Sequence, residues 1–137
     1  MKHKLSAIAL LAMAMPAQAG AAALTDAEAT FLDQLVTAAA VLSERCAGFE
    51  VDGAGGVQGG ARLLGSPAAA MAMIEAFDAA IKAHDGTSYD VRKFRPEVFE
   101  AASTTSRRVM AALRKNPDAA CADYGEAGLQ DGLLRKH

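Results

Sequence analysis

The segment LTDAEATFLDQLVTAAAVLSERC, residues 24–46, decides the fold of this chain. Thr25, followed three residues later by Glu28, matches a capping box, which marks the start of a helix. Apolar residues then recur at steps of three and four, as along one face of an amphipathic helix. They are Leu32, Leu35, Val36, Ala39, Leu42, Cys46 and Phe49. The segment therefore predicts a long helix that runs to about Cys46, with Gly48 as its stop.

Two further long helices are predicted by their end signals. Ser66-Pro67 offers a cap with proline at the first helical position, and Asp85-Gly86 ends that helix. Arg95-Pro96 begins another helix, which Asn116-Pro117 ends. Their expected inner faces are Ala70, Met73, Ile74, Phe77, Ile81 and His84, and then Val98, Phe99, Ala102, Thr105, Val109, Ala112 and Leu113. A short fourth helix contains Cys121 and ends near Gly125.

No stretch shows the alternation of a β-strand, so the predicted fold class is all-α. We expect a small helical bundle of three long helices plus a short C-terminal helix, closed by one disulfide. Six glycines between residues 48 and 60 predict a mobile Gly-rich loop, and the residues after Gly125 predict a flexible C-terminal tail. The spacing Gly55-x-x-x-x-Gly60 lacks the Lys and Ser or Thr of a phosphate-binding loop, which argues against nucleotide binding.

The N-terminus has the pattern of a secretion signal peptide over residues 1–19. A basic start is followed by the uncharged apolar run Leu5 to Met15 and by the small-residue site Ala17-Gln18-Ala19. The apolar run is too short to span a bilayer, so no membrane span is expected. The alternative is a retained anchor or a buried N-terminal helix. Cleavage after Ala19 would leave one mature helical domain, residues 20–137.

The chain has two cysteines, Cys46 and Cys121. In an exported protein the compartment is oxidising, so an even count favours a disulfide, here with a single intramolecular pairing. A reactive or metal-binding pair is the alternative, but there is no C-x-x-C motif and no histidine near either cysteine. We therefore predict a structural disulfide.

The charge is unevenly distributed along the sequence. Residues 20–78 carry two basic and eight acidic side chains, whereas residues 82–115 carry eight basic and four acidic ones. Within the second group Arg107, Arg108, Arg114 and Lys115 form a predicted basic ridge that could hold an unknown protein or an acidic ligand. The alternative is that these are ordinary solvated helix faces. The mature chain is mildly acidic and lacks interleaved aromatics, so no nucleic acid partner is expected.

No catalytic set, metal site or cofactor motif is predicted. His84 stands beside Asp85, but at a helix end a histidine more often stabilises exposed carbonyls than acts as a base. Spacings typical of metal sites are absent. Met71, Met73, Met110, Phe77 and Phe99 lie at helical spacing and are expected in the core, with an adaptable apolar groove as the alternative.

Two segments carry a resemblance: Arg45-Cys46-Ala47-Gly48-Phe49 and Cys121-x-x-Tyr124-Gly125-x-x-Gly128. Together, over about 15 residues, they resemble small uncharacterised exported two-cysteine proteins of Gram-negative bacteria. The resemblance implies a periplasmic location and a disulfide, and no activity. A more distant likeness is to the small helical acid-stress chaperones of the periplasm. The expected function is a non-catalytic periplasmic binding or interaction protein; the alternatives are a stress chaperone and a small-ligand-binding helical domain.

Overall fold

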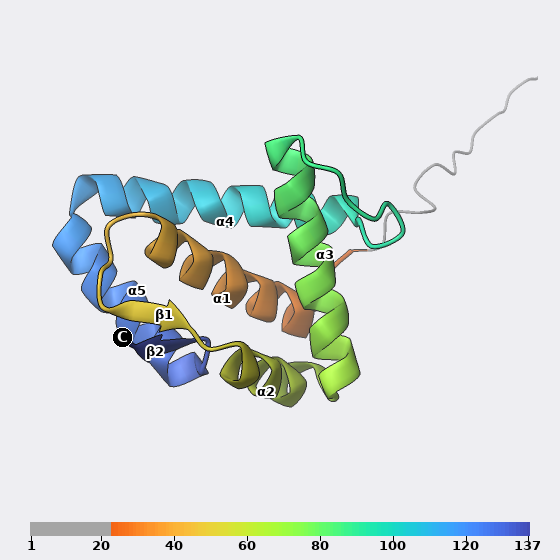
Figure 1. Cartoon of the computed structure of the whole chain (residues 1–137), viewed down its shortest axis with the longest axis horizontal. Coiled ribbons are helices and arrows are strands. Elements are labelled where there is room, and N and C mark those ends of the chain that lie inside the picture. Colours follow the sequence, from red (N-terminus) through yellow and green to blue (C-terminus); the bar gives the residue numbers. More distant parts are fainter. Residues whose placement is uncertain (1–22) are drawn as a thin grey trace, which may run out of the picture.

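The computed structural model of the protein describes residues 23–137, so the predicted signal peptide at residues 1–19 lies outside the described residues. The described chain is mostly helical, with one small sheet (Figure 1). Its elements, in order, are α1 (Asp26–Ser43), β1 (Phe49–Val51), α2 (Gly53–Leu64), α3 (Pro67–Asp85), α4 (Pro96–Lys115), α5 (Pro117–Asp131) and β2 (Leu134–Lys136). The three predicted long helices are confirmed as α1, α3 and α4.

Helix α1 lies at the centre of the molecule. It begins at the predicted capping box, in which Thr25 Oγ1 accepts a hydrogen bond from the backbone N–H of Glu28 and Glu28 Oε1 accepts one from that of Thr25. The other four helices and β1 all contact α1. Its buried face is therefore wider than the predicted stripe, and it includes Phe31 and Val41, both fully buried.

The predicted Gly-rich loop at 48–60 is wrong, because most of it forms helix α2. Asp52 caps this helix by accepting a hydrogen bond from the backbone N–H of Gly55 at 2.9 Å. Glycine is a poor helix former, but here the missing side chains let α2 approach its neighbours closely. A Cβ at Gly60 would lie 2.5 Å from the ring of Phe31, and one at Gly59 would lie 2.7 Å from the carbonyl oxygen of Asp131.

The C-terminal segment is a strand and not the predicted flexible tail. β2 pairs with β1 in antiparallel register, with Glu50 opposite Arg135. The hydrogen bond from the backbone N–H of Asp52 to the carbonyl of Leu133, at 2.9 Å, continues the pairing. Leu133 and Leu134 are both buried. Backbone pairing and the burial of two leucines together hold this end of the chain in place, so the fold is helical with a small sheet.

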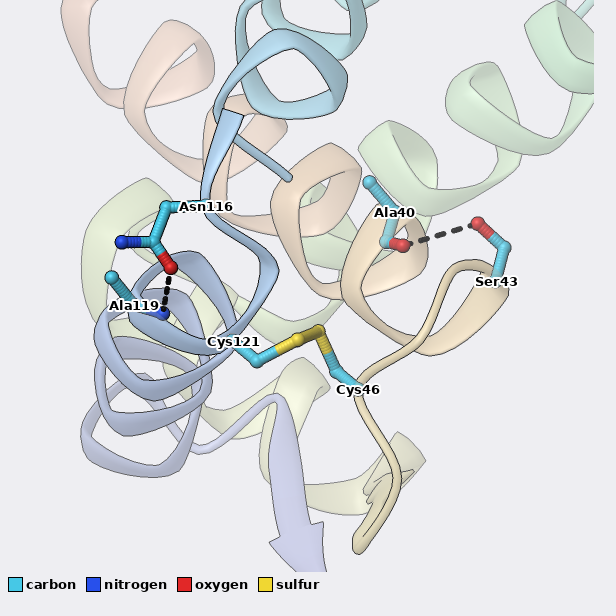
Figure 2. Close-up of a disulfide and its surroundings, with 6 residues drawn as sticks. All are labelled: Ala40, Ser43, Cys46, Asn116, Ala119 and Cys121. Carbon is cyan, nitrogen blue, oxygen red and sulfur yellow. Dashed lines mark hydrogen bonds between the residues drawn. A yellow bond between two sulfur atoms is a disulfide. The ribbon is translucent and has the colours of Figure 1, made fainter. Parts of the chain in front are cut away.

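The predicted disulfide between Cys46 and Cys121 is confirmed. Figure 2 shows the bond linking the segment after α1 to the first turns of α5, with the two Cα atoms 5.3 Å apart. Asn116 caps α5 beside it by accepting a hydrogen bond from the backbone N–H of Ala119. Helix α5 continues past the predicted stop at Gly125 to Asp131, since Gly125 packs directly on the ring of Phe49.

The helices differ in how they cross. α1 and α4 lie side by side, whereas α3 crosses both of them steeply (Figure 1).

Within residues 23–137 no single helix is long and apolar enough to cross a membrane. Only α2 and α3 taken together, with a bend of 112° between them, reach that length and composition.

Candidate functional site: a groove between α1, α3 and α4

An open groove of about 740 Å³ lies between α1, α3 and α4. The side-by-side pair α1 and α4 forms its floor, and the C-terminal half of α3 forms a wall. The apolar floor consists of Val36, Ala39 and Ala40 from α1 and of Phe99, Ala102 and Met110 from α4. Phe77, Ala80 and Ile81 supply the wall.

The steep crossing of α3 is the reason that this groove stays open. Steeply crossed helices touch over a short length, so side chains beyond the contact lose their partner. Ile81 was expected on the inner face of its helix, yet it is 40% exposed. Phe77 and Phe99 are only half-buried. The apolar faces that the periodicity correctly detected are therefore left partly uncovered here, and they become the lining of the groove.

The predicted apolar cluster is divided between the core and the groove. Met73 is fully buried in the core. Phe77, Phe99 and Met110 line the groove, as the alternative interpretation of the sequence expected. Met71 is exposed and is not part of the lining.

Polar side chains form the rim of the groove. α4 contributes Ser103, Ser106 and Arg107, and the end of α3 contributes His84 and Asp85. The Nδ1 atom of His84 lies 3.2 Å from Oδ1 of Asp85, and both side chains are exposed. The rim thus has basic and hydroxyl groups on the α4 side and a histidine–carboxylate pair on the α3 side.

Ion pairs link α1 to α4 and to Arg95, the residue that precedes α4. Arg95 Nη1 donates to Glu28 Oε2 at 3.0 Å, and the Arg95 guanidinium holds the pKa of Glu28 below its ordinary value. Further along the two helices, Arg108 pairs with Asp33, which also accepts a hydrogen bond from Thr105 at 3.1 Å. These cross-links fix the two floor helices against each other.

The four residues of the predicted basic ridge have different surroundings. Arg107 lies on the rim of the groove, while Arg108 is engaged by Asp33. Arg114 and Lys115 are exposed in the last turn of α4, where Lys115 borders a second, smaller hollow of about 290 Å³ against α5. The structure therefore sets Arg107 apart as the ridge residue next to the main groove.

The groove residues that the sequence interpretation missed are small ones. Ala39 was expected in the core, and Ala80, Ser103 and Ser106 were not singled out at all. Alanine and serine fill little space, so they widen the gap between helices. The available signal was the presence of alanine and serine next to residues of the predicted inner faces.

No protein-family model, curated protein or solved structure matches this chain significantly. Among residues 23–137, no group of three or more His, Cys, Asp or Glu side chains is arranged to hold a metal ion.

Proposed function

We propose that the chain is a non-catalytic, exported binding protein that holds a small molecule with an apolar body in the groove between α1, α3 and α4. The groove is the observation that carries the proposal. Small-molecule sites are typically clefts of about 300–1,000 Å³ with an apolar lining and a few polar groups. The volume of about 740 Å³, the aromatic and aliphatic lining and the polar rim match this description.

The periplasm is the proposed location. The predicted signal peptide and the resemblance to exported two-cysteine proteins support it. The Cys46–Cys121 disulfide is compatible with an oxidising extracellular compartment, since such bonds persist there.

Ile81 offers a direct test of the groove. It lines the wall and is already 40% exposed, so a change to glutamate there should leave the fold intact. Leu63 provides a matched control, because it is a helical leucine that is 38% exposed and lies outside the groove. The probe is N-phenyl-1-naphthylamine, a neutral apolar dye that fluoresces on burial.

We expect the mature chain to bind the dye and Ile81→Glu to weaken binding about tenfold, through the loss of apolar contact. Leu63→Glu should bind as the unchanged protein does. Far-ultraviolet circular dichroism checks that both variants are folded. Absence of dye binding to the unchanged protein, or equal weakening by both variants, would contradict the proposal.

A second candidate function is an acid-stress chaperone, and the Glu28–Arg95 pair is the observation that favours it. Strong acid protonates Glu28 and removes one of the links between α1 and α4. Opening of this seam would expose the apolar floor of the groove. If the chain is such a chaperone, it should bind more dye at pH 3 than at pH 7, and at pH 3 it should suppress the aggregation of a client protein. A chain that stays rigid and inert at pH 3 would exclude it.

A further inference from the structure

Three polar side chains of α4 stand together on the rim of the groove without strong partners of their own. Within residues 23–137, the hydroxyls of Ser103 and Ser106 make no side-chain hydrogen bond. Among the described residues, the Arg107 guanidinium donates a side-chain hydrogen bond only to Thr104 Oγ1, at 3.5 Å, which is the long limit for such a bond. Its neighbour Arg108, in contrast, is paired with Asp33. Arg107 therefore keeps its guanidinium donors available beside an apolar cavity.

The opposite rim carries a carboxylate beside His84. Asp85 lies in the last turn of α3, where the free carbonyls give a helix its partial negative charge. His84 is already hydrogen-bonded to Asp85. An anionic group entering the groove is thus disfavoured at the α3 rim and favoured at the α4 rim.

From this asymmetry we infer that the groove selects amphipathic anions, and that Arg107 binds their head group while the apolar part lies along α4. The inference rests on the proposed function and names its ligand class: a free molecule with one carboxylate and an apolar chain. Phe99 stands eight residues before Arg107 on α4, which is about 12 Å along a helix. The apolar chain of the ligand would extend along α4 from Arg107 toward Phe99, and its far end would lie between Phe99 and the wall residue Phe77.

The carboxylate would accept hydrogen bonds from the Arg107 guanidinium, a fork that matches two carboxylate oxygens. Ser103 lies one helical turn before Arg107, on the same side of α4, and its hydroxyl can donate a further bond. Because Arg107 is exposed, the contact is partly screened by water. The contact with Arg107 should therefore make the groove prefer carboxylates over other ligands, while most of the binding free energy comes from elsewhere.

Three ligands of equal chain length test the inference: dodecanoate, dodecanol and dodecyltrimethylammonium, each competing with the dye below its micelle concentration. The protein is the mature chain, residues 20–137. We expect dodecanoate to displace the dye at about fivefold lower concentration than dodecanol. The cationic ligand should be the weakest of the three.

Variants of two arginines show whether the preference for dodecanoate comes from a contact with Arg107 or from the net charge of the protein. Arg107→Gln should abolish the preference for dodecanoate, because it weakens the binding of dodecanoate more than that of dodecanol, whereas Arg107→Lys should keep part of the preference. Arg114→Gln removes the same charge from the same helix away from the groove, and it should keep the preference in full. A preference that survives in Arg107→Gln, or is lost equally in Arg114→Gln, would overturn the inference.

The outcomes also distinguish the two proposals. If the unchanged protein does not bind the dye, small-molecule binding in the groove fails and the inference falls with it. If the dye binds but the three ligands displace it equally or not at all, the proposed function stands and the inference alone is wrong. A last experiment measures whether the protein sediments with vesicles of phosphatidylglycerol. If it does, and Arg107→Gln no longer does, the ligand would be a membrane surface and not a free molecule, which would overturn the inference.

Discussion

Gly60 of α2 and Phe31 of α1 meet so closely that no side chain fits between them. A Cβ at Gly60 would lie 2.5 Å from Cζ of Phe31 and 2.8 Å from the Cβ of Ala70 on α3. Phe31 is fully buried and cannot swing away into solvent. The glycine thus brings three helices into contact at one point of the core.

The first prediction is that Gly60→Ala destabilises the protein, although alanine is the better helix former. Overpacking a rigid core costs about 1–3 kcal/mol, which exceeds the gain of about 1 kcal/mol in helix propensity. We expect the free energy of unfolding to fall by about 1 kcal/mol, measured by urea denaturation.

Gly53→Ala is the matched control for that change. Gly53 lies in the same helix, and a Cβ there would have no heavy atom within 4 Å. The substitution should leave stability unchanged or raise it by about 0.5 kcal/mol, through the lower entropy of the unfolded chain. An equal loss in both variants would show that the helix, and not the contact with Phe31, is affected.

Helix α2 shows why part of this fold could not be predicted from the sequence. The signals that were correct are local ones: the capping box at Thr25, proline at the first position of α3 and α4, and Gly86 after α3. The glycines of α2 are unfavourable locally, and their compensation comes from residues far along the chain, Phe31 and Asp131. The β1–β2 pairing likewise joins three-residue segments about 85 residues apart, too short for a visible alternation.

The sequence predicted several residues that line the groove, but not that a groove would form between α1, α3 and α4. Periodicity identified Phe77, Ile81 and Phe99 as apolar inner-face residues, and the structure places all three in the lining. Whether such a face is covered depends on the angle at which α3 crosses α1 and α4. That angle is set by packing between distant segments, so no local pattern records it. The separate surroundings of Arg107 and Arg108 follow from the same packing.

The second prediction concerns the disulfide, which closes a loop with a sequence separation of 75 residues. In the chain-entropy model such a bond stabilises by about 4 kcal/mol, because it restricts the unfolded chain. Replacing both cysteines by alanine should lower the free energy of unfolding by roughly this amount, as measured in urea. Reduction of the unchanged protein should produce a similar loss. A double variant as stable as the parent would show that the bond is dispensable.

The third prediction is a pH-dependent effect at Glu28. Arg95 and the cap hydrogen bonds lower the pKa of Glu28 in the folded state below its ordinary value of 4.5. A lowered carboxyl pKa stabilises the fold above the unfolded-state pKa, and this contribution is lost as the pH falls through the folded-state pKa. Glu28→Gln should therefore cost about 1 kcal/mol at pH 7 and nearly nothing at pH 2. Thermal unfolding at both pH values measures the difference, with Glu126→Gln as an exposed control. A loss independent of pH would contradict the assignment.

The fourth prediction has the opposite sign and concerns Asp131, the last residue of α5. Burial raises the pKa of this carboxyl above its ordinary value of 3.8, so ionisation costs more in the folded chain than in the unfolded one. The C-terminal end of a helix also disfavours negative charge. Asp131→Asn should raise stability by about 0.5 kcal/mol at pH 7, and the gain should vanish below the unfolded-state pKa, where the parent is neutral in both states. A variant that is less stable at pH 7 would show that the carboxylate has a role beyond its unfavourable charge.

The last prediction separates a held C-terminal strand from a flexible tail. Leu133 and Leu134 are buried, whereas Arg135, Lys136 and His137 are exposed. Deleting residues 133–137 should lower the free energy of unfolding by at least about 3 kcal/mol, because two leucines leave the core and the partner strand β1 loses its hydrogen bonds. Deleting only residues 135–137 removes exposed side chains and part of the pairing, so we expect a loss of about 1 kcal/mol. Hydrogen exchange should show the amide of Asp52 unprotected only in the longer deletion, since that amide bonds to the carbonyl of Leu133. If both truncated chains were as stable as the parent, the burial of these leucines would contribute nothing to folding, and the strand would be an incidental contact.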